Sequence, residues 1–290
     1  MSAGSATLRT HLTSIRRRLS AAGVTNAEQE ARWLLCDGLR LSSAELLAHP
    51  EREVVLPEAL EAGIRRREAG EPLQYVLGTA DFWGRDFRVG PGVLVPRGDT
   101  EVLVRAALDI FPQDAPFTFL DWGTGSACIA ATLLLERPLA RGILAERSPD
   151  ARKWAAENLA RWDLSSRAHL LPTDAPEDIA VRGECDLLIS NPPYVPRGAI
   201  PHLMREVRDH EPHLALDGGT DGMDCYRALL ASAPAWLKPG AFVILETGGS
   251  DQARAIRDVA ERSPNRAFSF LQGIADDSAI LRCVVLKYRG

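Results

Sequence analysis

Four consecutive residues carry the clearest chemical signal: Asn191-Pro192-Pro193-Tyr194, which come directly after an apolar strand-like run that ends at Ser190. Pro192 and Pro193 have no backbone N–H, so this stretch offers carbonyl acceptors with few competing donors. The Asn191 side-chain oxygen and the Pro192 carbonyl can each accept one proton of a planar NH2 group, beside the aromatic face of Tyr194. The motif favours a clamp for an amide or an exocyclic amine, and an ordinary proline-rich turn is the alternative.

A second candidate site lies in residues 119–127, Phe-Leu-Asp-Trp-Gly-Thr-Gly-Ser-Ala, which predict a strand, a glycine turn and the start of a helix. Gly123 and Gly125 allow a ligand to approach the backbone closely. Glu146 ends the next predicted strand about 20 residues later, where a carboxylate commonly binds the ribose hydroxyls of a nucleoside. A plain βα turn is the alternative, because a glycine pair alone is weak support for a site.

Asp121 helps to choose between two nucleoside ligands. A carboxylate directly before the turn repels a pyrophosphate but can accept from the ammonium group of an amino acid. Cys128 also stands where a dinucleotide site needs glycine or alanine. Because S-adenosyl-L-methionine carries both an ammonium group and a ribose, the turn favours S-adenosyl-L-methionine over NAD.

Alternating strands and helices, beginning near Phe117, must position these residues, and this alternation is typical of an α/β sheet. The predicted strands are residues 117–120, 142–145, 168–171, 186–190, 241–246 and 278–288, and the predicted helices are residues 126–135, 150–162, 226–236 and 250–263. Ligands bind beyond the strand carboxyl ends of such sheets, so the glycine turn, Glu146, Asp174 and Asn191 are expected at one rim. Asp174 can accept there from an adenine amine, and a solvated loop carboxylate is the open alternative.

The region before this alternation contains no cluster of residues with evident chemistry. Helices are predicted over residues 7–21, from a capping box at 25–28 through 35, from Ser42 onward, and over 57–69. Residues 74–78 and 93–95 are predicted to be strands, and residues 81–89 are predicted to form a hairpin. A helix led by the polar residues Thr100 and Glu101 is expected next.

Composition narrows the classes of function. The chain has 290 residues and a formal net charge of −5, which argues against broad nonspecific nucleic-acid binding. No apolar stretch approaches the roughly 18–20 residues of a membrane helix, and no apolar segment follows Arg16-Arg17-Arg18 as a secretory signal requires. Five scattered cysteines show neither CxxC spacing nor a small disulfide framework. We therefore expect a cytoplasmic protein with no membrane partner.

Together these segments resemble the release factor glutamine methyltransferases, the HemK-type family, over nearly the whole chain. The segments that carry the resemblance are residues 71–78 (Glu-Pro-Leu-Gln-Tyr-Val-Leu-Gly), 95–97 (Val-Pro-Arg) with Thr100-Glu101, 121–130, 186–194, 211–212 with 215–216, and 237–240. Asn-Pro-Pro-Tyr alone also marks N6-adenine methyltransferases, whereas residues 71–78 with the helical N-terminus are far more specific.

The resemblance implies an α/β protein. A seven-stranded, Rossmann-like class I methyltransferase domain would span residues 96–290, preceded by a helical substrate-docking domain over residues 1–74 and a β-hairpin linker over residues 75–95. The implied reaction is methyl transfer from S-adenosyl-L-methionine to the side-chain nitrogen N5 of the glutamine in the Gly-Gly-Gln motif of peptide-chain release factors. We expect a monomer with no nucleic-acid partner.

The expected site residues combine the local patterns with positions that match the family. The cofactor set is Asp121, Gly123, Thr124, Gly125, Ser126, Ala127, Glu146, Asp174, Ala175 and Asn191. The substrate set is Asn191, Pro192, Pro193 and Tyr194, of which Asn191, Pro192 and Tyr194 are expected to act in catalysis without a metal or a histidine base. The departures from the family pattern are Gly98-Asp99 for Pro-Glu, Ala127 for a common glycine, Trp122 for a leucine and Glu146 for an aspartate.

Two other classes of function compete with this interpretation. An N6-adenine methyltransferase acting on DNA or RNA would use the same clamp, but it needs a flipped base and a basic groove, and the acidic balance of the chain counts against it. The second alternative is a non-catalytic scaffold that binds release factors. The presence of Asp121, Gly123, Gly125 and Asn191 weighs against a scaffold.

Overall fold

The computed structural model describes residues 5–290, which form two compact units. The first unit contains the chain up to Thr79 together with Met204–His210. The second unit contains Ala80–Leu203 and Glu211–Gly290. Each unit has its own apolar core.

The first unit is a small helical bundle. Its elements are β1 (Ala6–Thr7), α1 (Leu8–Ala21), α2 (Ala27–Leu39), α3 (Ser43–Ala48), β2 (Glu53–Val54), α4 (Glu58–Glu68), α5 (Leu73–Leu77) and α9 (Arg205–His210). Helix α1 confirms the helix predicted over residues 7–21, and the helical spacing of Leu8, Ile15 and Leu19 puts all three side chains in the core of the unit. At α3, the Ser42 hydroxyl accepts from the Glu45 N–H and the Glu45 carboxylate accepts from the Ser42 N–H, which is a capping box.

Two local predictions for the region up to residue 78 are wrong. Residues 74–78 are not a strand: residues 73–77 form the short helix α5, because Pro72 opens a turn whose Leu73 and Tyr75 side chains are buried. Short apolar runs of this length do not distinguish a strand from a buried helix. The capping box expected at residues 25–28 is also absent: the N-cap of α2 is Asn26 rather than Thr25, and the Asn26 side chain makes no capping hydrogen bond.

The second unit is built on a seven-stranded sheet, in the order β10-β11-β9-β8-β5-β6-β7. Its strands are β5 (Thr118–Trp122), β6 (Arg141–Glu146), β7 (Ala168–Pro172), β8 (Cys185–Ser190), β9 (Leu237–Glu246), β10 (Phe268–Ala275) and β11 (Leu281–Tyr288). The pairs β5–β6, β6–β7, β5–β8 and β8–β9 are parallel, and β11 runs antiparallel to both β9 and β10. The expected seven-stranded α/β sheet is confirmed, although β10 was not predicted.

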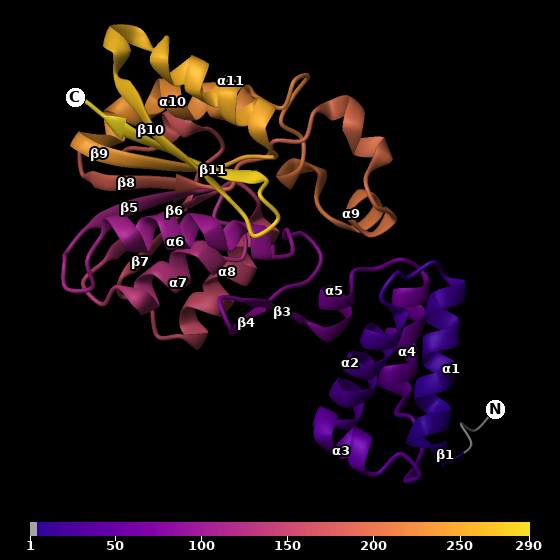
Figure 1. Ribbon diagram of the computed structural model, residues 1–290. Coiled ribbons are helices and arrows are strands. Elements are labelled where there is room, and N and C mark those ends of the chain that lie inside the picture. The colour runs from indigo at the N-terminus through magenta and orange to yellow at the C-terminus, as the bar shows by residue number, and fades with distance from the viewer. Residues whose placement is uncertain (1–4) are drawn as a thin grey trace. The chain divides into compact units, whose positions relative to one another are not determined.

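Helices cover both faces of this sheet (Figure 1). One face packs against α6 (Glu101–Ile110), α7 (Cys128–Glu136) and α8 (Pro149–Arg161), and the other packs against α10 (Asp224–Trp236) and α11 (Ser250–Glu261). Successive strand residues alternate between the faces, so Phe119 is buried with the first group of helices and Leu120 with the second.

The remaining elements of the second unit are short. The pair β3 (Thr79–Phe82) and β4 (Arg85–Arg88) forms a two-stranded sheet, as the hairpin prediction requires. The 3-10 helices are η1 (Gly98–Thr100), η2 (Pro176–Asp178), η3 (Arg197–His202), η4 (His213–Ala215) and η5 (Pro264–Arg266). The strand expected at residues 93–95 is wrong, because this buried segment joins no sheet and lines a cavity instead. Across residues 5–290, no helix combines the length and the apolar character needed to cross a membrane.

Candidate functional site

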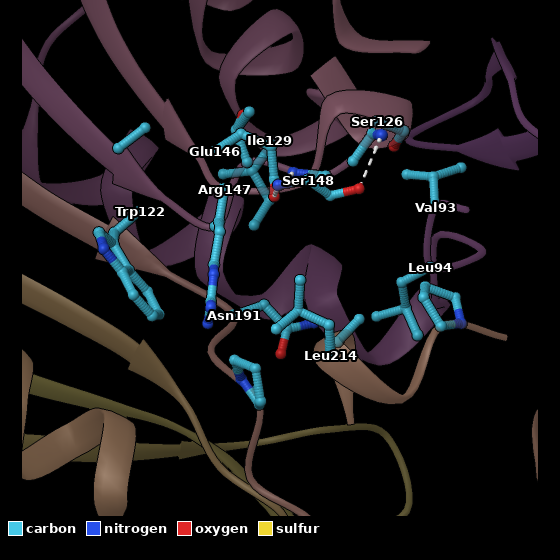
Figure 2. A pocket seen from close by; sticks show the side chains of 18 of the residues that line it. Val93, Leu94, Trp122, Ser126, Ile129, Glu146, Arg147, Ser148, Asn191 and Leu214 are labelled. Carbon is cyan, nitrogen blue, oxygen red and sulfur yellow. Dashed lines mark hydrogen bonds between the residues drawn. The ribbon is translucent and has the colours of Figure 1, made fainter. Parts of the chain in front are cut away.

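A cavity of about 240 Å³ lies in the second unit at the carboxyl ends of β5, β6 and β8. Several segments that are distant in sequence line it, among them residues 92–97, 122–126, 145–148 and 214–215. Figure 2 shows Trp122, Glu146 and Asn191 around this hollow. The parallel strands therefore bring the glycine turn, the acid after β6 and the first residue of the Asn-Pro-Pro-Tyr motif to one rim.

The glycine turn between β5 and α7 adopts left-handed backbone at two positions. Gly123 has a φ of +72° and Gly125 a φ of +57°, a region in which a side chain is strained. A Cβ atom added at Gly123 would meet nothing within 4 Å, so this part of the turn faces open space. Thr124 and Ser126 also line the cavity. Ala127 does not: it is fully buried as the left-handed N-cap of α7, with a φ of +63°.

Glu146, at the end of β6, is held by two backbone donors. Its Oε2 accepts from the Gly125 N–H at 2.9 Å and its Oε1 accepts from the Ser148 N–H at 2.8 Å. The side chain lines the cavity and is largely buried. Each carboxylate oxygen keeps a further lone pair, so Glu146 can still accept from a pair of ligand hydroxyls.

Asp121 lies behind the cavity lining and is completely buried. Its Oδ2 accepts from the Thr124 hydroxyl at 2.7 Å, whereas its Oδ1 has no hydrogen-bond partner. Burial, with a further contribution from the charge of Glu146, raises the pKa of Asp121 to about 7. A buried carboxylate oxygen without a donor is a costly arrangement, and it marks a position that a cationic ligand group would stabilise.

The loop after β7 contributes one predicted residue to the cavity. Asp174 lines the rim, but its side chain is 86% exposed and lies 3.8 Å from the Arg147 Nε. Ala175 is not part of the lining, and its N–H donates to the Asp178 carboxylate. Asp174 is therefore placed for a solvent-exposed contact only.

The Asn-Pro-Pro-Tyr motif divides between two environments. Asn191 and Pro193 line the cavity, whereas Pro192 is buried and Tyr194 is not among the lining residues. The Asn191 Nδ2 donates to the Thr100 Oγ1 at 3.2 Å. The Tyr194 hydroxyl lies 3.4 Å from the Glu246 Oε1, and burial raises the pKa of Tyr194 above its ordinary value.

A glycine-rich loop over residues 217–222 supports the backbone of the motif. The Val195 carbonyl accepts from the Gly218 N–H at 2.9 Å. A Cβ atom on Gly218 would lie 2.8 Å from the Tyr194 Cα, and one on Gly222 would overlap the Tyr194 carbonyl oxygen. A side chain at Gly218 or Gly222 would therefore displace the motif.

The structure adds lining residues that we did not predict as cofactor or substrate contacts. The Arg97 Nη2 donates to both carboxylate oxygens of Glu211 at 2.7 Å, and the Glu211 side chain is only 1% exposed. Arg147, Leu214 and Cys225 also line the cavity. The segments 95–97 and 211–212 carry the family resemblance, and that was the signal available for Arg97 and Glu211.

Comparisons with known proteins match both parts of the chain. The model of the PrmC N-terminal domain matches residues 10–78, and the model of the methyltransferase small domain matches residues 100–219. The release factor glutamine methyltransferase of Moorella thermoacetica is 44% identical over 259 residues, which cover 88% of this chain and 89% of that protein. The protein of the same name from Cereibacter sphaeroides is 44% identical over 84% of this chain and 86% of its own length.

Solved structures agree on the fold. A methyltransferase from Pyrococcus furiosus superposes with a TM-score of 0.52 at 17% identity, over 79% of this chain and 98% of that one. At this identity the likeness concerns the fold alone.

Proposed function

This chain belongs to the release factor glutamine methyltransferase family, and from that premise we propose how its cavity performs the reaction. The enzyme uses S-adenosyl-L-methionine to methylate the side-chain N5 of a release factor glutamine. The observation that carries the proposal is the meeting of the glycine turn, Glu146 and Asn191 at one cavity. A donor site and an acceptor clamp are both required there for methyl transfer.

The residues around the cavity fit the methyl donor. The open space at Gly123, the free lone pairs of Glu146 and the buried Asp121 carboxylate behind the lining suit a backbone approach, a ribose and a positively charged ammonium group. Thr124 and Ser126 would line the same ligand, with Asp174 at its exposed end. When bound, S-adenosyl-L-methionine would supply an activated methyl group: its S–C bond would break as the N–C bond forms, leaving a neutral thioether, and the amide nitrogen would release one proton to water.

The task of the Asn-Pro-Pro-Tyr motif is to orient a poor nucleophile. An amide nitrogen shares its lone pair with the carbonyl, so holding it in line with the methyl group is the main catalytic need. The Asn191 Oδ1 and the Pro192 carbonyl would accept hydrogen bonds from the two amide N–H groups and stabilise the positive charge that grows on nitrogen. Tyr194, with its hydroxyl held at Glu246, would pack its ring beside the amide and exclude water.

The organisation of the whole protein belongs to the same proposal. Residues 1–74 would dock the release factor, residues 75–95 would link the domains, and residues 96–290 would perform the transfer. We place the enzyme in the cytoplasm as a monomer that binds neither nucleic acid nor membrane. The net charge of −5 argues against nucleic-acid binding. The five free cysteines are typical of a protein in the reducing cytoplasm. Sedimentation equilibrium tests the monomer, and cell fractionation tests the location.

Replacing Asn191 tests the clamp. In Asn191→Ala, kcat toward a release factor should fall about 100-fold or more, the scale of losing one transition-state contact, while the Kd of S-adenosyl-L-methionine should rise by no more than about tenfold, the scale of one neutral hydrogen bond. Calorimetry gives the Kd and a labelled-methyl assay gives kcat. The exposed Asn265→Gly, which keeps a left-handed backbone at φ +56°, is the matched control and should behave as the wild type. Unchanged kcat in Asn191→Ala would refute the clamp.

A further inference from the structure

A buried chain of polar side chains lies behind Asn191. The Asn191 Nδ2 donates to Thr100 at 3.2 Å, and hydrogen bonding by the Thr100 side chain lowers the pKa of Glu246. Glu246, at the end of β9, is 1% exposed, and its Oε2 has no hydrogen-bond partner. Thr100 comes from η1, so three segments distant in sequence meet in one network.

The count of protons in this network fixes the direction of the Asn191 amide. A hydroxyl group has one proton to give, and an ionised carboxylate can only accept. Thr100 must therefore donate to ionised Glu246, which leaves its oxygen to accept from Asn191. The Asn191 NH2 group is then held on Thr100, and its Oδ1 is the end available to a ligand in the cavity.

A protonated Glu246 removes this constraint. The carboxylic acid can donate a hydrogen bond to Thr100, and the Thr100 hydroxyl can then donate one to the Asn191 Oδ1. The amide is then free to turn and present its NH2 group to the cavity. A substrate amide offers its own NH2 group there, so donor would face donor and the clamp would fail.

We propose that Thr100 and Glu246 are positioning residues, and that the ionisation of Glu246 decides which end of the Asn191 amide meets the substrate. This inference rests on the proposed function, because it explains how the clamp acquires its direction. Neither side chain needs to touch the reacting atoms.

The surroundings of Glu246 put its titration near neutral pH. Burial raises the pKa of Glu246 to about 7, although hydrogen bonding by Thr100 and Tyr194 lowers this pKa. The charge of Asp99 raises the pKa of Glu246 further, and the charge of Arg282 lowers it. The charged and titratable groups that interact with Glu246 are Asp99, Tyr194, Arg282, Cys128, Tyr226 and Cys283. The pKa values of both tyrosines and both cysteines are raised, so these four groups stay neutral near pH 7. Below about pH 7 Glu246 takes up its proton, and we expect turnover to fall.

The kinetic test follows kcat with pH at saturating substrate and S-adenosyl-L-methionine. The pKa of Asp121 is also about 7, and at saturation its titration no longer affects the measured rate through binding. In the wild type, kcat should fall up to about tenfold per pH unit below pH 7. Glu246→Gln should be at least about tenfold slower at pH 8 and should lose this acid limb. Thr100→Val should be about as slow, and Thr100→Ser, which keeps the hydroxyl, should recover to within about threefold of the wild type.

Asp99→Asn is the matched carboxylate control, one residue from Thr100. Removing its charge should move the acid limb to lower pH and keep kcat above the limb, because Asp99 raises the pKa of Glu246. The Kd of S-adenosyl-L-methionine and the thermal unfolding of each variant show whether folding or binding has failed instead. A Glu246→Gln enzyme with wild-type kcat and an unchanged acid limb would overturn the proposal.

A spectroscopic readout separates this inference from the proposed function. The 15N signal of the Asn191 side-chain NH2 group, assigned by its loss in Asn191→Ala, should shift with a midpoint near the pKa of about 7 in the wild type. The shift should vanish in Glu246→Gln, and its persistence there would contradict the network. If the wild type methylates no release factor, the proposed function fails, whereas the NMR titration still decides the inference.

Discussion

Glu146 combines two backbone hydrogen bonds with remaining acceptor capacity for a ligand. It accepts from the Gly125 and Ser148 N–H groups and still has lone pairs for a ribose. Its removal would leave two partly buried backbone donors unpaired and would also take away the acceptor of the ligand. A residue of this kind should affect cofactor binding more than turnover.

Glu146→Ala is therefore expected to weaken S-adenosyl-L-methionine binding by about 10–100-fold, the equivalent of about 1.5–3 kcal/mol for hydrogen bonds to a charged group. Calorimetry measures the Kd. Glu157→Ala, an exposed glutamate on α8, provides the control and should bind as tightly as the wild type. Equal Kd values for both variants would remove Glu146 from the site.

At the same scale, sequence reasoning found the residue types but not their partners. The spacing of the glycine turn and Glu146 predicted a shared rim, since parallel strands end at one edge, and the cavity contains them. The spacing could not predict that Tyr194 reaches Glu246, which lies 52 residues away in sequence. Nor could it predict that Asp121 is fully buried behind Thr124. The cofactor and substrate roles of these residues stay predictions.

Among the elements, the loop over residues 217–222 is the support of the motif. Gly222 has a φ of +76°, and a side chain there would overlap the Tyr194 carbonyl oxygen. The Gln252 Nε2 donates to that carbonyl at 3.1 Å and to the Gly222 carbonyl at 2.9 Å, so the two backbones are tied together. A shift of this loop would move the motif itself.

We expect Gly222→Ala to lower kcat by about 100-fold, since a misplacement of about 1 Å in catalytic geometry has this effect. The free energy of unfolding should also decrease, by more than about 1 kcal/mol, because alanine is strained at a positive φ. Gly198→Ala is the control in the same region: its Cβ would meet nothing within 4 Å, and its φ is ordinary. If both variants showed wild-type rates, the loop would not position the motif.

Element prediction succeeded for the alternating strands and helices after Phe117 and failed for short apolar runs outside that alternation. Strands β5, β6, β7, β8 and β9 and helices α7, α8, α10 and α11 all overlap the predicted ranges. Residues 74–78 failed because five residues suit a strand or a buried helical turn equally well. Strand β10 was missed because only Phe268 in it is fully buried, so its sequence lacks a clear apolar pattern.

On the scale of the whole molecule, the chain passes between the two units three times, at 79/80, 203/204 and 210/211. Residues 204–210 are part of the first unit, where Arg67 is paired with Glu30 at 2.5 Å and with Glu206 at 2.9 Å. The Arg67 side chain is 6% exposed. Sequence spacing gave no sign of this, because Glu206 follows the Asn-Pro-Pro-Tyr motif and precedes Glu211, both of which belong to the other unit.

The central claim is that the Asn-Pro-Pro-Tyr motif presents a release factor glutamine to S-adenosyl-L-methionine. The most direct test is mass spectrometry of a release factor digested after incubation with the enzyme and labelled S-adenosyl-L-methionine, with DNA and RNA present in the same mixture. We predict one added methyl group on the glutamine of the Gly-Gly-Gln peptide, no label in nucleic acid, and none on a Gly-Gly-Glu variant of the release factor. Label in the nucleic acid, or an unmodified glutamine, would contradict the account.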